Sequence, residues 1–187
     1  MSGTRERILE LGEELILTKG YNGFSYQDIS TALGIKNAAI HYYFASKENL
    51  GTSIVKTNIQ RFEEMMANME ALQFDPEKKI ETFIKIYIKS QRERKLCIVG
   101  ALSTDIETLF PTTQVEVTKI VDLIVNWLTG VLIEGKKQGV FQFEEEEKQR
   151  AFVILSSLVA SLQLARVNKY VDYKGYCYSL VEQLKEQ

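Results

Sequence analysis

Proline, cysteine and histidine are scarce in this chain of 187 residues, which holds two prolines, two cysteines and one histidine. With so few helix breakers, and with Leu, Ile, Glu and Lys abundant, the composition favours an all-α fold. Cys97 and Cys177 are too few for a disulfide framework and fit a reducing cytosol as small buried side chains. One histidine and two distant cysteines exclude the ligand spacing of a zinc or histidine-rich metal site. No metal and no cofactor is therefore predicted.

Uninterrupted apolar runs and catalytic motifs are also missing. The most apolar stretch, residues 151–167, contains three serines, Gln163 and Arg166, so no membrane span is expected. Charged residues from Arg5 onward precede any apolar run, so no signal peptide is expected either. The chain has no glycine-rich nucleotide loop and no nucleophile-elbow motif, and no catalytic residue is predicted. These absences favour a cytoplasmic protein that is not an enzyme.

The charge balance excludes a globally basic nucleic-acid binder. The chain carries 23 Lys and Arg against 25 Asp and Glu, a net charge of −2. Residues 1–50 are no more basic, with five basic and six acidic side chains. Any affinity of this part for DNA must therefore come from the local placement of charge.

Residues 25–50 carry the clearest pattern in the chain. Ser25 followed by Asp28 is the signature of a capping box, and Gly34 supplies a left-handed residue that ends a short helix. A second short helix begins directly afterwards. This helix–turn–helix pattern places residues 36–43 on the helix that would enter a major groove of DNA.

An ordinary helical hairpin in an all-α core is the competing interpretation. The outward positions of the second short helix are cationic, amide, small or aromatic, and no acid lies between Asp28 and Glu48. Packing alone gives no reason to exclude carboxylates from one face, whereas phosphates do. Tyr43 and Phe44 are expected in the core. Gly12, costly inside a helix, is expected to mark a close crossing with the first helix of the hairpin.

The segment GYNGFSYQDISTALGIKNAAIHYYFASKENL, residues 20–50, resembles the N-terminal domain of TetR-type (tetracycline-repressor-like) transcriptional regulators. The resemblance covers about residues 5–50, and its most specific part is YFASKE, residues 43–48. Ala38 and Ala39 stand where the family usually has glycine and often threonine, and Ala45 replaces a common proline. The order of His41 and Tyr42 is reversed relative to the family. The departures concern the bases that are read, not the fold.

The resemblance implies a set of DNA-contacting side chains. By position in the motif, Tyr42 and Lys47 contact phosphates, with Ser25 and Gln27 contributing. The candidates for contacts with base edges are Lys36, Asn37, Ala39 and His41. Asparagine can pair with adenine, lysine can donate to guanine, and the alanine methyl can touch a thymine methyl. The structural alternatives are a packed ring for Tyr42 and a solvated charge for Lys47. The full predicted set is Ser25, Gln27, Lys36, Asn37, Ala39, His41, Tyr42 and Lys47.

The predicted architecture is an N-terminal three-helix domain, residues 1–50, joined without a linker to a larger helical domain, residues 51–187. Ser46 caps the connecting helix, whose apolar pattern continues to Met69. Because this helix leaves one domain and enters the other, a shift at its far end can change the placement of the reading helix.

The larger domain is predicted to bind a ligand and to form a dimer. Methionines and aromatic residues at helical spacing are interpreted as the lining of a cavity for an unidentified small-molecule effector, with plain core packing as the alternative. The resemblance implies that the last two long helices, Glu145 to about Tyr170 and Tyr173–Leu184, pair with their copies, with an intramolecular core helix as the alternative. The predicted ligand-binding residues are Met65, Met66, Phe83, Tyr87, Trp127 and Phe152.

Two functions compete. The leading hypothesis is a sequence-specific transcriptional regulator, a homodimeric repressor released from a palindromic double-stranded DNA operator by a small-molecule ligand. The alternative is a helical interaction module whose helix-turn-helix docks a protein partner, and the near-neutral N-terminal part favours it.

Overall fold

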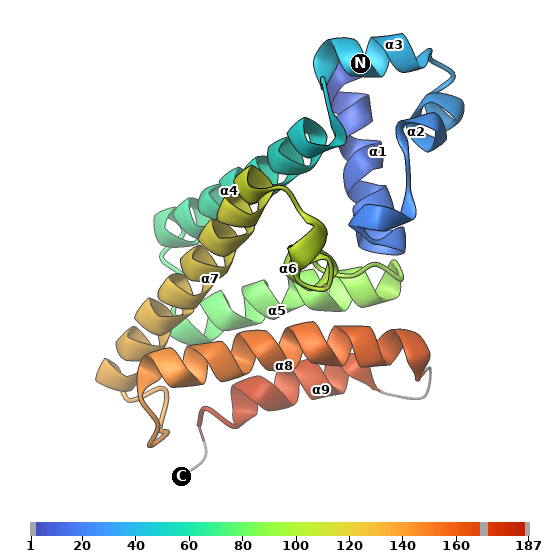
Figure 1. The fold of residues 1–187 in the computed structure, drawn as a ribbon. Helices are drawn as coiled ribbons and strands as arrows, with labels where there is room; N and C mark the ends of the chain where they lie inside the picture. The colour runs from blue at the N-terminus through green and yellow to red at the C-terminus, as the bar shows by residue number, and fades with distance from the viewer. Residues whose placement is uncertain (1–2, 169–171, 186–187) are drawn as a thin grey trace. The chain divides into compact units, whose positions relative to one another are not determined.

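All secondary structure in the computed structural model is helical over residues 3–168 and 172–185, which are the residues that it describes (Figure 1). The predicted all-α class is therefore confirmed. The helices are α1 (Thr4–Lys19), η1 (Tyr21–Gly23), α2 (Tyr26–Leu33), α3 (Asn37–Tyr43), α4 (Lys47–Ala71), α5 (Pro76–Arg92), α6 (Ile98–Ser103), η2 (Ile106–Thr108), α7 (Pro111–Lys137), α8 (Glu147–Val167) and α9 (Tyr173–Glu182).

The chain forms two compact units, each built from two segments of sequence. The first holds Met1–Arg61 and Ile98–Ile120, and the second holds Phe62–Cys97 and Val121–Gln187. This division differs from the predicted boundary between residues 50 and 51. The difference has a physical cause, because α4 has no break at that point and because α6 packs against α1.

In the first unit, α2 begins and ends where the sequence predicts. The backbone N–H of Ser25 donates to the Asp28 carboxylate at 2.7 Å, and the two residues form a capping box. Hydrogen bonds from Ser25 lower the pKa of the Asp28 carboxyl. Gly34 ends the helix with φ 66° and ψ 32°, the left-handed conformation that glycine adopts without a Cβ clash.

Gly12 marks a close approach, but of a different pair of helices from the one predicted. A Cβ at this position would lie 3.1 Å from the Ile54 side chain and 3.2 Å from that of Leu50. Both of those residues belong to α4. The prediction that Gly12 crosses α2 is therefore wrong, because the tight contact is with the long helix that follows the helix-turn-helix.

The turn after α1 is joined to residues far along the chain. The Tyr21 backbone N–H donates to the Asp105 carboxylate at 2.8 Å, and the Asn22 amide donates to the Thr108 hydroxyl, also at 2.8 Å. The hydroxyls of Thr52 and Thr113 share a hydrogen bond of 2.9 Å. These contacts explain why η2 and the first turns of α7 belong to the same unit as α1, α2 and α3.

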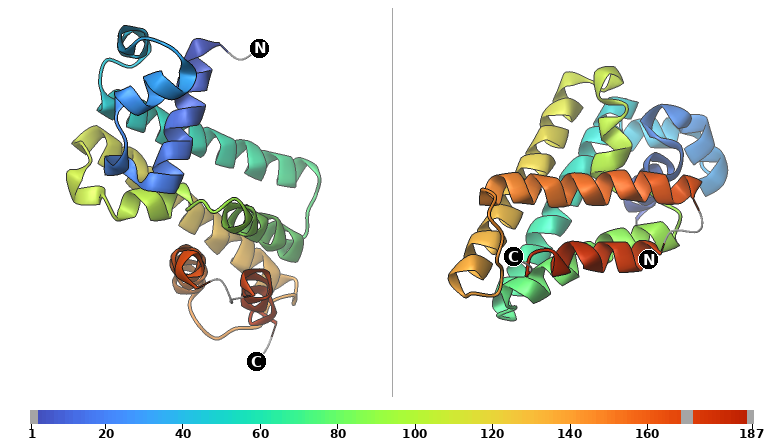
Figure 2. Two further views of the ribbon diagram at one scale, coloured as in Figure 1. Left: turned by 90° about the vertical axis from the view of Figure 1, so that its right-hand side faces the viewer. Right: turned by 90° about the horizontal axis from the view of Figure 1, so that it is seen from below.

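In the second unit, α5 packs against both α8 and α9, which also contact each other (Figures 1 and 2). The connection after α7, predicted as strand-like or irregular, is irregular. There the ring of Phe141 is buried against Gly135, where a Cβ would collide with it, and the Gln142 N–H donates to the Leu184 carbonyl at 2.6 Å. α8 ends at Val167, and its predicted end near Tyr170 lies outside the described residues.

α8 is long and apolar enough to cross a membrane by length and composition, with 21 residues and a mean hydropathy of 1.4. A core helix of a water-soluble protein passes the same test. In this structure α8 packs against α5 and α9, and one of its faces supplies a row of buried side chains: Ala151, Ile154, Leu155, Leu158, Leu162 and Ala165. Packing inside the protein therefore accounts for the apolar side chains on this face of α8.

Candidate nucleic-acid interface

The helix-turn-helix is held together by one buried side chain from each helix. Ile29 of α2 and Ile40 of α3 are both fully buried. Between them Ser30, also buried, donates its hydroxyl to the Gln27 carbonyl at 3.0 Å, so its polar atom is satisfied inside the hairpin. Because Ile40 anchors one side of α3, the opposite side of this short helix is free to face solvent.

Most of the predicted base-reading residues lie on that solvent side. Lys36, at the N-cap of α3, and Asn37 and His41 are exposed, whereas Ala39 is half-buried. Tyr42 is 83% exposed, so the alternative of a packed ring is excluded for its side chain. The structure therefore brings the predicted contacts of α3 together on one short helix.

Asn37 is held in place by the preceding helix. Its carboxamide donates to the Gln27 side-chain oxygen at 3.1 Å, and the Gln27 side-chain nitrogen donates to the Thr31 hydroxyl, also at 3.1 Å. All three side chains are exposed. The orientation of Asn37 is thus set by α2, and one amide hydrogen and the carbonyl oxygen remain available for a base edge.

The C-terminal end of α3 is tied to α2 through aromatic contacts. The ring centres of Tyr26 and His41 lie 5.0 Å apart, edge to face, and the Tyr26 hydroxyl donates to the Phe44 carbonyl at 3.0 Å. Burial raises the pKa of Tyr26 to about 12. Tyr26 therefore keeps its proton, and this hydrogen bond, throughout the physiological pH range.

Phe44 is buried as predicted, but Tyr43 is not. The Tyr43 side chain is 39% exposed, and its ring meets that of Tyr42 edge to face at 5.0 Å. The prediction that Tyr43 lies in the core is therefore wrong. Only one of the two adjacent aromatic residues can point inward at the end of a helix, and Phe44 takes that place.

The Lys47 side chain faces inward. This placement differs both from the predicted phosphate contact and from the alternative of a solvated charge. Its ammonium donates to the Phe24 carbonyl and lies over the rings of Phe24 and Tyr21, 4.2 Å and 4.9 Å from their centres. Burial lowers the pKa of this ammonium, and the Asp105 and Asp28 carboxylates act in the opposite direction. The side chain clamps the turn between α1 and α2 onto the start of α4.

Three acids of this unit, Glu13, Asp28 and Glu48, have partners outside α3. Glu13 binds Arg61 at 2.7 Å, Asp28 caps α2, and Glu48 accepts a hydrogen bond from the Thr112 hydroxyl at 2.5 Å. α3 itself carries no carboxylate. A near-neutral unit therefore presents a local surface, from Lys36 to Tyr42, that is free of negative charge.

The predicted effector-binding residues are only partly brought together. Phe83, Tyr87 and Trp127 form one ring cluster with Phe62, and neighbouring ring centres lie 5.4–6.0 Å apart. Met65 and Met66 are half-buried on α4. Phe152 is separate from this cluster, since its side chain is 59% exposed on α8. Within residues 3–168 and 172–185 no group of His, Cys, Asp and Glu is arranged to hold a metal ion.

Comparisons with known proteins agree with this geometry. The sequence profile of "Bacterial regulatory proteins, tetR family" matches residues 8–52, which include α2 and α3. A TetR transcriptional regulator from Legionella pneumophila is 31% identical, with a TM-score of 0.88 over 98% of this chain and 97% of its own. The chain belongs to the TetR family of bacterial transcriptional regulators.

Two further relatives support this assignment. A TetR-family regulator from Agrobacterium tumefaciens is 27% identical, with a TM-score of 0.89 and coverage of 97% of both chains. The HTH-type transcriptional repressor DhaR from Mycobacterium sp. (strain GP1) is 23% identical over 72% of this chain and 68% of its own length. These relatives are transcriptional regulators, so the helix-turn-helix of this TetR-family protein serves DNA binding, and the protein-interaction alternative is not favoured.

Sequence reasoning missed the residues that fix the TetR-type helix-turn-helix to the rest of its unit. Asp105 and Thr108 lie 84 and 86 residues from their partners, Tyr21 and Asn22. No local periodicity signals a contact over such a distance. The Gln27–Asn37 hydrogen bond is different, because the resemblance placed both residues near DNA without relating one to the other.

Proposed function

We propose that this TetR-family regulator is a homodimeric repressor, released from a palindromic operator by a small-molecule effector. The observation that carries the proposal is the acid-free exposed surface of α3, with Asn37 oriented by Gln27. Two such helices in a symmetric dimer would read two half-sites of a palindrome, one turn or somewhat more apart. Such a protein acts in the cytoplasm, on the bacterial chromosome.

In this proposal the side chains in and next to the helix-turn-helix have different roles. Asn37 and Lys36 contact base edges, and Tyr42 contacts a phosphate, because all three side chains are exposed at α3 and its N-cap. Ser25 and Gln27 border the surface from α2, and Ala39 and His41 border it within α3. Lys47 keeps a supporting role rather than a phosphate contact, since its ammonium is already bound to Phe24.

The exposed face of α8 supports the homodimer. Phe152, Ser156, Ala160, Leu164 and Val167 recur every three or four residues, and all five are exposed. Such spacing places them on one side of the helix. Leu164 and Val167 are 67% and 84% exposed, so a second copy of α8 would remove substantial apolar surface from water.

Release by an effector is supported by the course of two helices. α4 and α7 each begin in the first unit and continue into the second. The second unit also holds Met65, Met66, Phe83, Tyr87 and Trp127, which we propose border the effector, whereas Phe152 belongs to the exposed face of α8. A ligand that favours one placement of these helices would shift the population of DNA-competent dimers.

The test is fluorescence anisotropy of the purified protein, titrated against duplex DNA from the region upstream of its own gene at two salt concentrations. We expect tight, salt-sensitive binding to one fragment and weaker binding to a scrambled duplex of the same composition. Footprinting on the bound fragment should then reveal two related half-sites. Equal binding to both duplexes at both salt concentrations would contradict the proposal and return the protein-docking alternative.

A further inference from the structure

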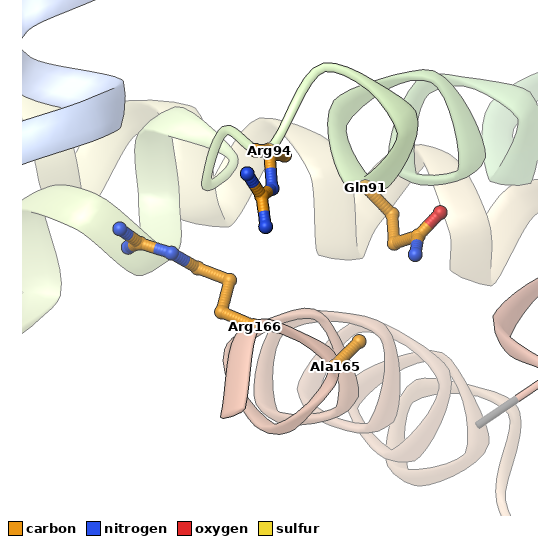
Figure 3. Close-up of a pocket in the computed structure, with 4 residues that line it drawn as sticks. All are labelled: Gln91, Arg94, Ala165 and Arg166. Carbon is orange, nitrogen blue, oxygen red and sulfur yellow. The ribbon is translucent and has the colours of Figure 1, made fainter. Parts of the chain in front are cut away.

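A cavity of about 320 Å³ lies between the end of α5 and the end of α8, within the second unit (Figure 3). It is lined by Gln91, Arg94, Ala165 and Arg166. The side chains of Arg94 and Arg166 project into the space between the two helices, one from each side, and the Gln91 amide lies beside them (Figure 3). None of the six residues predicted to bind an effector lines this cavity.

The polar groups of the cavity suit an anion. Guanidinium groups are permanently charged and present planar forks of N–H donors that match carboxylate and phosphate oxygens. A carboxamide adds a further donor. No carboxylate is present among the lining residues that the structure describes.

The backbone at Arg94 provides a second, independent observation. Arg94 has φ 58°, a left-handed conformation that glycine adopts readily and arginine does not. It follows the end of α5, where the Lys95 N–H donates to the Ser90 carbonyl at 2.9 Å and the Arg94 N–H donates to the Gln91 carbonyl at 3.0 Å. Glycine is the usual residue at this point of such a helix end. An arginine at this position places a guanidinium group where the usual glycine would place no side chain.

A purely structural role, as a basic residue at a helix C-terminus, does not account for Arg94. Basic side chains stabilise helix C-termini by interacting with the backbone dipole. In α5 that role is already filled by Lys89 and Arg92, which lie in its last turn. Arg94 lies beyond the helix and faces the cavity instead. Ala165, small and buried, leaves the hollow unfilled from the α8 side.

We propose that this cavity binds the anionic group, carboxylate or phosphate, of the effector through Arg94, Arg166 and Gln91. The effector role rests on the proposed function, whereas the binding of an anion does not. The anion holds the end of α5 to the end of α8 by two forked contacts. Neutral molecules of the same shape lack those contacts and bind more weakly.

The test is isothermal titration calorimetry of the full chain at constant ionic strength with three matched probes. Benzoate carries a carboxylate, phenyl phosphate carries a phosphate, and benzamide is the neutral control. We expect at least one anion to bind about tenfold or more tightly than benzamide, as a charge-assisted hydrogen bond implies. The stronger of the two anions identifies the chemistry of the effector's group.

Three variants locate the binding. Arg94→Gly removes one guanidinium and suits the left-handed backbone, so this variant should fold at least as stably as the wild type while losing about tenfold in anion affinity. Arg166→Gln should lose a similar factor. Arg92→Gln, an exposed residue of the same helix end that does not line the cavity, is the matched control and should bind the anions as the wild type does.

The result that would overturn the binding site is equal affinity of the wild type for the anions and for benzamide, or anion binding that survives both Arg94→Gly and Arg166→Gln. Operator titration with and without the better anion then tests the effector role. An anion that binds through both arginines but leaves the affinity for DNA unchanged overturns that role. Operator binding is also measured without any probe. Because that measurement tests the regulator proposal alone, a failure of the regulator proposal can be told apart from a failure of the anion proposal.

Discussion

The ammonium of Lys47 lies 4.2 Å from the centre of the Phe24 ring and donates a hydrogen bond to the Phe24 carbonyl. This pair joins the first turn of α4 to the segment that enters α2. The lysine is thereby part of the scaffold that positions the reading helix, although the family motif places it at the DNA backbone.

Replacing Lys47 by alanine should therefore lower the free energy of unfolding by about 1–3 kcal/mol, because it removes a charge-assisted hydrogen bond and two cation–π contacts at a half-buried position. Urea denaturation followed by circular dichroism measures this loss. Lys36→Ala, at an exposed position of the same unit, is the control and should change stability by less than about 0.5 kcal/mol. The folded Lys47→Ala protein should keep the wild-type salt dependence of DNA binding, and a salt slope lower by about one would instead restore the phosphate contact.

Gln27 and Asn37 should act as one unit in base recognition. Asn37→Ala should reduce discrimination at one base pair of each half-site by about 1–3 kcal/mol, since it removes a base-edge contact. Gln27→Ala should reduce discrimination at the same base pair, because Asn37 then loses its orienting acceptor. In a double-mutant cycle on operator and point-substituted duplexes, the two effects should not add. Additive effects, or effects at different base pairs, would show that Gln27 does not act through Asn37.

Asp105 should stabilise the turn after α1 from a distance. Asp105→Ala leaves the Tyr21 N–H without its acceptor and should reduce the free energy of unfolding by about 1–2 kcal/mol. Asp105→Asn keeps a side-chain oxygen and should lose less. Glu107→Ala, in the same short helix and exposed, is the control, and a loss as large as that of Asp105→Ala would assign the effect to η2 as a whole.

Acid should weaken the start of α2. The pKa of Asp28 in the folded protein lies below its usual value of 3.8, chiefly because Ser25 hydrogen-bonds to the ionised form. A lowered pKa means that this stabilisation is complete above pH 3.8 and is lost as the pH falls through the folded-state pKa. The difference in urea midpoint between wild type and Asp28→Asn should therefore shrink between about pH 5 and about pH 2. A difference that stays constant over this range would show that the charge of Asp28 does not contribute.

Dimerisation should depend on the exposed face of α8. Leu164→Glu places a charge within the proposed interface, where its desolvation opposes association, so this variant should sediment as a monomer at concentrations where the wild type is a dimer. Val115→Glu alters another exposed apolar residue, on α7 in the other unit, and should leave the association state unchanged. Analytical ultracentrifugation of both variants makes the comparison. A dimeric Leu164→Glu protein with wild-type affinity would remove α8 from the interface.

The parts of the fold that sequence reasoning predicted are those encoded over a few residues. Ser25 with Asp28, and Gly34 after α2, are local signals whose meaning does not depend on the rest of the chain. The sequence places Tyr43 and Gly12 in the wrong surroundings and does not relate Lys47 to Phe24, because these contacts follow from how helices meet and not from residue spacing. For the same reason the motif gave the composition of the reading surface but not the hydrogen bond between Gln27 and Asn37.

The candidate effector site shows the same limit more strongly. Arg94 and Arg166 are 72 positions apart in the sequence. Each of them, taken alone, is an ordinary basic residue near a helix end. The periodicity of methionine and aromatic residues predicts the ring cluster of Phe83, Tyr87 and Trp127 but gives no sign of these two arginines. A hollow between two helix ends depends on where each helix stops, and helix ends are the least predictable feature of a sequence.

The split composition of the first unit bears on protein engineering. A chimaera that exchanges only residues 1–50 to transfer operator specificity would leave behind Asp105, Thr108 and Thr112, the hydrogen-bond partners of Tyr21, Asn22 and Glu48. Such a graft keeps every base-contacting side chain but loses some of the hydrogen bonds that position the helix carrying them. Transplanting residues 98–120 together with residues 1–61 preserves those hydrogen bonds, so the portable specificity module of this protein is two pieces of sequence rather than one.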